Sequence, residues 1–162
     1  MDFTLFVIAA LSAAKQRLIK MKIATIYHYY ELNETYKENF IYFLNTSIID
    51  QVEYFFYISG SCTVELPSLS NVQYANIENK NNDFGGLVEF SKNKDSLNFD
   101  TYIFVNSSMR GPFLPPYYSP NWYEVFTSKL SNKIAMVGSS INLLPIESFH
   151  SDYFNKKFNY SP

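Results

Sequence analysis

The chain has 162 residues and a mass of 18.9 kDa, with a hydrophobic fraction of 47% and a charged fraction of 17%. This size and composition describe one globular domain and exclude an intrinsically disordered chain. The net charge of −2 and the scattered basic residues give no reason to expect a nucleic-acid partner. The single cysteine, Cys62, excludes an intramolecular disulfide.

Residues 1–20 contain a short apolar run that is followed by basic residues. The run covers 5–14, and Asp2 stands where a secretory signal carries positive charge. It is shorter than the roughly 20 apolar residues that a membrane-spanning helix needs. Three interpretations remain: a membrane-associated leader, a helix packed on the domain, or an extension upstream of a chain that starts at Met21. The last is favoured, because the residues after Met21 read as a natural first strand. We therefore expect a leader or N-terminal extension over 1–20 and a single domain over 21–162.

Strand-like and helix-like segments alternate through the rest of the chain. A β-branched apolar run over 23–27 predicts a strand, and Asn33 is placed to cap a helix with apolar positions at Tyr36, Phe40, Phe43 and Leu44. Further strands are expected over 52–58, 72–77, 102–105 and 134–137. Further helices are expected from 81–83 onward, with Leu87, Val88 and Phe90 on the apolar side, and over 122–130.

The predicted strands are continuously apolar, which is typical of strands buried on both faces. The sequence therefore predicts an α/β fold with three layers, α/β/α, and a mainly parallel sheet.

The carboxyl ends of parallel strands share one edge of a sheet, and ligands bind in the crevice outside them. The residues expected there are His28 and Tyr29, Ser59 and Gly60, Asn81 to Asp83, and Asn106, Ser107 and Ser108. This supports a ligand edge but names no ligand, because one fold serves many functions.

Most familiar catalytic motifs are missing from the sequence. No phosphate-binding G-x-x-x-x-G-K-[ST] loop, dinucleotide G-x-G-x-x-G turn or G-x-S-x-G elbow occurs. His28 is either a ligand contact or a half-buried histidine with a backbone partner. Asp83 either caps a helix or accepts a hydrogen bond from a base or ribose hydroxyl. Arg110 is either a diphosphate contact or part of a surface ion pair.

Four segments give the chain a resemblance to a family of GT-A-type glycosyltransferase-like proteins. They are MKIATIYHYYELNETYKENFIYFL, YANIENKNNDFGG, YIFVNSSMRGPFLPPY and WYEVFTSKLSNKIAMVGSSIN, which together span most of 21–142. The third and fourth are fairly specific, whereas the first two alone are weak. The resemblance implies a GT-A fold, a nucleotide-sugar donor and a glycan acceptor. Similar proteins build polysaccharides and continue past Asn142 into an acceptor-side region. Three interpretations of the chain follow: a truncated gene, a fragment, or a donor-binding half that needs a partner.

The resemblance implies that Asp83 contacts the nucleotide and that Asn106, Ser107 and Ser108 occupy the place of a metal-binding D-x-D motif. No D-x-D occurs in the chain, and Asn and Ser are poorer ligands for Mg²⁺ or Mn²⁺ than carboxylates. Two options follow: the diphosphate is bound without a tightly held metal and with help from Arg110, or a weak Mg²⁺ or Mn²⁺ arrives with the donor.

The expected function is transfer of a sugar from a nucleotide-sugar to a glycan. The alternative is a catalytically inactive relic of the same fold that binds a nucleotide, a glycan or another subunit. We expect a cytoplasmic protein, peripheral to a membrane if residues 1–20 associate with one. The sequence assigns neither the catalytic base nor the oligomeric state.

Overall fold

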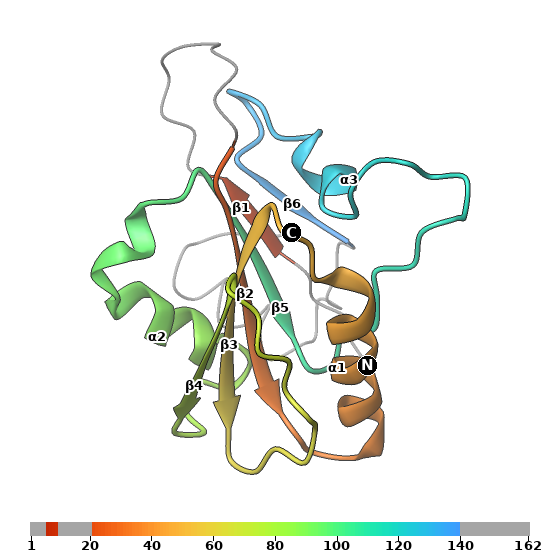
Figure 1. Cartoon of the computed structure of the whole chain (residues 1–162). Helices are drawn as coiled ribbons and strands as arrows, with labels where there is room; N and C mark the ends of the chain where they lie inside the picture. Colours follow the sequence, from red (N-terminus) through yellow and green to blue (C-terminus); the bar gives the residue numbers. More distant parts are fainter. Residues whose placement is uncertain (1–5, 10–20, 140–162) are drawn as a thin grey trace, which may run out of the picture.

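A computed structural model describes residues 6–9 and 21–139. They form a mixed α/β domain around a six-stranded sheet with the order β4-β3-β2-β5-β1-β6 (Figure 1). The strands are β1 Phe6–Ala9, β2 Ile23–Tyr30, β3 Val52–Ser59, β4 Val72–Ile77, β5 Thr101–Asn106 and β6 Met136–Gly138. The helices are α1 Glu34–Ser47, α2 Gly85–Lys92 and α3 Glu124–Thr127, with 3-10 turns η1 Asn82–Phe84 and η2 Lys94–Leu97.

Four neighbouring strands, β4, β3, β2 and β5, are all parallel. The predicted α/β class with a mainly parallel sheet is therefore confirmed. β2 and β3 are buried along almost their whole length, whereas β4 alternates between exposed and partly buried residues because it lies at the edge of the sheet. β1 is antiparallel to both β5 and β6.

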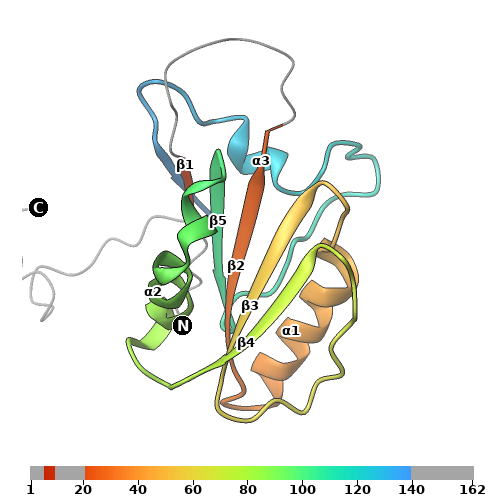
Figure 2. The same ribbon diagram turned by 60° about the vertical axis from the view of Figure 1, so that its left-hand side comes forward.

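α1 and α2 lie on opposite faces of the parallel strands, which gives the three predicted layers (Figures 1 and 2). The face under α1 is aromatic: Tyr27 and Tyr29 of β2 pack on Phe40 and Phe43 of α1. Asn33 caps α1 as predicted, with its Oδ1 accepting a hydrogen bond from the Tyr36 N–H at 3.0 Å. Such a cap stabilises a helix by about 1 kcal/mol.

The face under α2 has a second, smaller core. Phe90 of α2 packs edge-on against Phe55 of β3, and Ala24, Ile26 and Phe104 complete the contact. Val88, expected on the apolar side of this helix, is instead 37% exposed. Its neighbours Leu87 and Phe90 face the sheet, and a short helix buries only one stripe.

Three further expectations about elements need revision. Residues 6–9, assigned to the leader or extension, form β1 between β5 and β6. The helix expected over 122–130 is helical only over Glu124–Thr127, because the amides of Lys129 and Leu130 bond to the third preceding carbonyl and form turns. The last strand is Met136–Gly138, since Ile134 pairs with Ser131 in an isolated bridge. The rest of the leader, 1–5 and 10–20, and the tail from residue 140 onward lie outside the described residues.

No helix within residues 6–9 and 21–139 combines the length and the apolarity that crossing a membrane requires.

Candidate functional site

The order of the parallel strands reverses between β2 and β5. The chain runs from β2 outward through β3 to β4, and then returns to the other side of β2 as β5. In open α/β sheets, the carboxyl ends of the strands at such a reversal form the usual ligand crevice. His28 and Asn106 pair directly across this junction. Both point to the α2 side, because Ile26 and Phe104, two residues earlier, lie in the core under α2.

His28 is enclosed between the sheet and the start of α2. Its ring Nε2 lies 2.7 Å from the Oγ of Ser59 at the end of β3, and only 4% of the residue is exposed. Burial lowers the pKa of His28 below its usual 6.5, although backbone oxygens and the carboxylate of Asp83 act in the opposite direction. His28 is thus buried and not half-buried, with the Ser59 hydroxyl at its Nε2. Backbone groups of Asp83 and Asn82 also act on it. Contact of His28 with a ligand stays a prediction.

Two glycines allow α2 to approach His28 closely. A Cβ on Gly86 would lie 3.0 Å from the His28 Cβ and 3.2 Å from the Tyr57 Cβ. A Cβ on Gly85 would lie 2.9 Å from the His28 ring and 2.6 Å from the Lys80 carbonyl oxygen. Both positions therefore require glycine because a larger side chain would clash with the sheet or with the Lys80 carbonyl, and not because of an unusual φ. Sequence reasoning passed over this pair, although two glycines at the start of a predicted helix are a readable sign of close packing.

Asp83 lies in η1, directly before α2. Neither η1 nor α2 has a side-chain N-cap, so the capping interpretation of Asp83 is not what the structure shows. Asp83 is exposed, and its negative charge raises the pKa of His28, against the larger effect of burial. The structure therefore leaves the Asp83 carboxylate accessible beside the β2–β5 junction.

Asn106 is buried, with 3% of the residue exposed, and its two amide atoms have different surroundings. The Oδ1 accepts hydrogen bonds from the N–H of Ser108 at 3.2 Å and from its Oγ at 2.7 Å. The Nδ2 is buried and has no hydrogen-bond partner within the described part of the chain. An unpaired buried donor costs free energy, so this group marks a place where a ligand acceptor would stabilise the protein.

Ser107 fixes the end of β5 to β2 and α1. Its Oγ accepts a hydrogen bond from the Tyr30 N–H at 2.7 Å and donates one to the His28 carbonyl at 3.2 Å. Its own carbonyl accepts from the Nδ2 of Asn39 on α1 at 3.0 Å. The hydroxyl and the carbonyl of Ser107 are thus both used in hydrogen bonds within the protein. Asn39, which holds the carbonyl, is a supporting residue that the sequence did not indicate.

Tyr29 and Arg110 lie away from the α2 side of the junction. Tyr29 is fully buried and stacks on Phe40, and its hydroxyl donates to Glu31 at 2.9 Å. Arg110 lies against α1, where it pairs with Glu38 at 3.2 Å and sits 5.4 Å from the centre of the Tyr42 ring. The structure therefore brings together His28, Asp83 and Asn106, and does not bring Tyr29 or Arg110 to them.

The residues in the D-x-D place do not form a ligand set for Mg²⁺ or Mn²⁺. The Oδ1 of Asn106 is already used by Ser108, and the Oγ of Ser107 by backbone groups of β2. Hard divalent cations prefer several oxygen ligands, carboxylates above all. Within the described ranges, no cluster of three or more His, Cys, Asp or Glu side chains is placed to hold a metal ion.

The fold and this site define a mixed α/β domain with a four-stranded parallel sheet, compatible with a Rossmann-like class, and with a polar junction at its strand reversal. Comparison of the chain with protein-family models, curated proteins and solved structures finds no match.

Proposed function

We propose that the protein binds the diphosphate-linked nucleotide of a sugar donor at the β2–β5 junction and transfers the sugar to a glycan. The observation that carries this proposal is the buried, unpaired Nδ2 of Asn106 at the point where the strand order reverses. Within the described structure this N–H group has no acceptor, and a phosphate or ribose oxygen of a bound ligand would supply one. Many ligands carry such oxygens, and we propose a nucleotide-sugar among them because the sequence resemblance implies one.

The burial of Asn106 and the exposure of Asp83 support the roles in this proposal, and the nucleotide contact of Asp83 is what the sequence resemblance implies. The Nδ2 of Asn106 donates a hydrogen bond to an oxygen of the nucleotide-sugar, and the carboxylate of Asp83 accepts one from a base or a ribose hydroxyl. His28 shapes the floor of the junction through Ser59, since its Nε2 is occupied at 2.7 Å. The ligand set at Asn106 to Ser108 favours binding without a resident metal, so we derive no step through Mg²⁺ or Mn²⁺.

The test is a titration with UDP-, GDP- and dTDP-sugars, with Mn²⁺ and with a chelator, followed by thermal unfolding and calorimetry. A true donor stabilises the protein by about 2.7 kcal/mol at a hundredfold excess over its Kd. Asp83→Ala abolishes this stabilisation. Asn106→Ala weakens binding about tenfold, the usual cost of a lost hydrogen bond to a charged group. Failure of every nucleotide to stabilise the protein rejects the proposal.

Two further variants separate binding from folding. Asn106→Asp keeps an oxygen in place for both hydrogen bonds from Ser108 but replaces the unpaired donor by a negative charge. Because a buried, unpaired carboxylate costs free energy, this variant should unfold at a lower temperature, and calorimetry well below that temperature should show weaker binding of the diphosphate. Asn45→Ala removes an exposed amide from α1 and should leave the Kd unchanged.

A second candidate function is nucleotide or glycan binding without catalysis. It is favoured by the absence of any carboxylate among Asn106, Ser107 and Ser108. Donor binding without donor hydrolysis or sugar transfer, measured by release of the free nucleoside diphosphate, selects it over the transferase.

Membrane association through residues 1–20 stays a prediction, as does the cytoplasmic location. Deletion of these residues is a poor test, because Phe6–Ala9 pair with β5 inside the sheet. Co-sedimentation of the full chain with neutral and anionic liposomes is the better measurement, and recovery of all the protein in the supernatant rejects the association.

A further inference from the structure

A polar cleft lies beside Gly85, the residue that packs on His28. It has a volume of about 340 Å³ and lies between the end of β4 and the first turns of α2. This is within the range of about 300–1,000 Å³ that is typical of small-ligand pockets. Its polar lining consists of two amides, two carboxylates and two ammonium groups, from Asn76, Glu78, Lys80, Asn81, Glu89 and Lys92.

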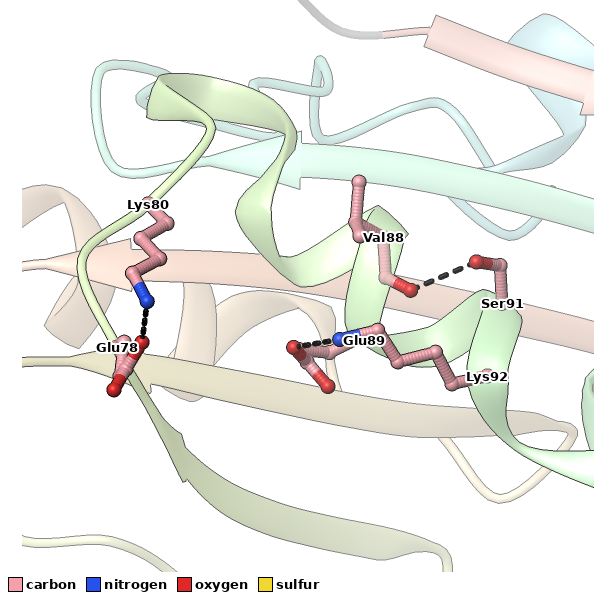
Figure 3. A network of polar contacts seen from close by, with 6 residues as sticks. All are labelled: Glu78, Lys80, Val88, Glu89, Ser91 and Lys92. Atoms are coloured by element: carbon pink, nitrogen blue, oxygen red, sulfur yellow. Dashed lines mark hydrogen bonds and ion pairs between the residues drawn. The ribbon is translucent and has the colours of Figure 1, made fainter.

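The charged groups form one ion pair on each wall (Figure 3). Glu78 and Lys80 pair on the segment that follows β4. Glu89 and Lys92 pair on α2, with 2.5 Å between their charged atoms. All four charged residues line the same cleft. Lys80 lowers the pKa of Glu78, and Lys92 adds a weaker effect of the same sign.

The balance of charge restricts the kind of ligand. Each ammonium group pairs with a carboxylate, and the pairs are largely exposed to solvent. The described lining therefore offers no excess of positive charge for a phosphate and no free carboxylate pair for a metal ion. Among the described residues, the lining includes one apolar side chain, Ile77, and no aromatic ring on which a nucleobase would stack. What remains is a dense alternation of hydrogen-bond donors and acceptors.

Neighbouring hydroxyl groups of a sugar match this alternation, because each hydroxyl both donates and accepts a hydrogen bond. Carboxylates of Glu78 and Glu89 accept from such hydroxyls, and the two ammonium groups donate to them. The hydroxyl of Ser91, just outside the lining, already donates to the Val88 carbonyl at 2.7 Å (Figure 3).

The cleft and the junction share one segment of chain. Asn81 and Gly85 line the cleft, and Gly85 also packs on the His28 ring. A sugar in the cleft therefore lies on the far side of the same turn that covers the β2–β5 junction.

We propose that this cleft binds one saccharide unit of the glycan acceptor, through hydrogen bonds to Glu78, Glu89, Lys80 and Lys92. The inference rests on the proposed function for its biological meaning, but its binding chemistry is tested separately. The ligand class is a neutral polyhydroxylated sugar and not a nucleotide or a divalent cation.

The experiment records amide chemical shifts of the full chain during titration with methyl glycosides of glucose, galactose, mannose, rhamnose and N-acetylglucosamine. At least one should shift residues 76–92 in a saturable manner at millimolar concentration. Glu89→Gln should weaken that sugar about tenfold, because a charge-assisted hydrogen bond is lost. Glu65→Gln is the matched control, since Glu65 is an exposed glutamate that does not line the cleft.

The outcomes separate the two proposals. If no glycoside shifts residues 76–92, or if Glu89→Gln binds as tightly as the unmodified protein, the cleft proposal is overturned even where nucleotides bind. If a glycoside binds there and every nucleotide fails, the cleft proposal stands and the nucleotide-sugar function falls.

Discussion

The two faces of the sheet differ sharply at the carboxyl ends of β2 and β5. On the α1 side, Tyr29 stacks on Phe40 and bonds to Glu31, and the Ser107 carbonyl accepts from Asn39. The Tyr27 hydroxyl and the Asn39 Oδ1, however, are buried without a partner among the described residues. On the α2 side, Asn106 has a donor that is unpaired among the described residues, Asp83 is exposed, and glycines bring the helix onto His28. Residues that follow one another in the sequence thus divide into a set with structural partners and a set that we propose binds the ligand.

The physical reason is the two-residue period of a strand. Neighbouring residues of a strand point to opposite faces of the sheet. His28 therefore points to the α2 side and Tyr29 to the α1 side. Asn106, on the α2 side, is likewise separated from Ser107, whose hydroxyl bonds to the backbone of β2. Polar residues at a strand end therefore indicate a ligand edge without showing which of them meet the ligand. Substitutions on the two faces should therefore have different effects on stability and on ligand affinity.

The largest effect is expected on the α1 side. Phe40 is fully buried and contacts three aromatic rings, Tyr27, Tyr29 and Phe56. Phe40→Ala should lower the free energy of unfolding by about 3–5 kcal/mol, measured by denaturant titration. If that variant does not fold, Phe40→Leu should cost less than about 1.5 kcal/mol and leave nucleotide affinity unchanged. A loss of affinity with an intact fold would show that the α1 side belongs to the site.

A smaller but more specific effect is expected at Gly85. Alanine normally favours a helix over glycine by about 1 kcal/mol. Here the added Cβ would lie 2.6 Å from a backbone oxygen, so Gly85→Ala should destabilise the protein by about 1–3 kcal/mol instead. Ser91→Ala, at an exposed position of the same helix, is the control. A stabilised Gly85→Ala protein would disprove the close approach of α2 to His28.

Glu31 tests how much the α1 side depends on its polar contacts. Its carboxylate accepts hydrogen bonds from the Thr63 N–H and Oγ1, each at 2.7 Å, and from Tyr29. The Thr63 amide in particular lowers the pKa of Glu31. Glu31→Gln should cost about 1 kcal/mol at neutral pH. Because the folded pKa is lowered, this difference should disappear as the pH falls through that pKa, which denaturant titration at several pH values checks.

The smallest effect is expected from His28 and is limited to acidic pH. Its folded pKa is lowered, so the unfolded chain takes up the proton first, and stability should fall as the pH drops below about 6.5. The measurement uses a His150→Gln background, in which His28 is the only imidazole. In this background, His28→Gln should remove the decrease in the free energy of unfolding that occurs as the pH drops from neutrality to below about 6.5. An unchanged slope would contradict the buried, neutral histidine.

Much of the fold was predictable from the sequence. Asn33 indicated the start of α1, and the apolar runs indicated four parallel strands, since local spacing and capping chemistry determine such elements. β1 was not predictable, because a four-residue strand within an apolar stretch carries no distinctive period. The shortened α3 was missed as well, since tight turns beyond Thr127 have the same apolar spacing as a helix.

Within the site, the sequence was enough to locate the polar residues at the strand ends, His28 and Asn106 among them, and Asp83 before α2; that they form a ligand edge stays a prediction. The tertiary structure was needed to show that Tyr29 and Arg110 lie on the α1 side and that Gly85 lies against His28. It also showed the charge-balanced cleft beside β4. Strand ends are encoded locally, whereas the face on which a side chain finds its partners depends on residues 30 to 80 positions away.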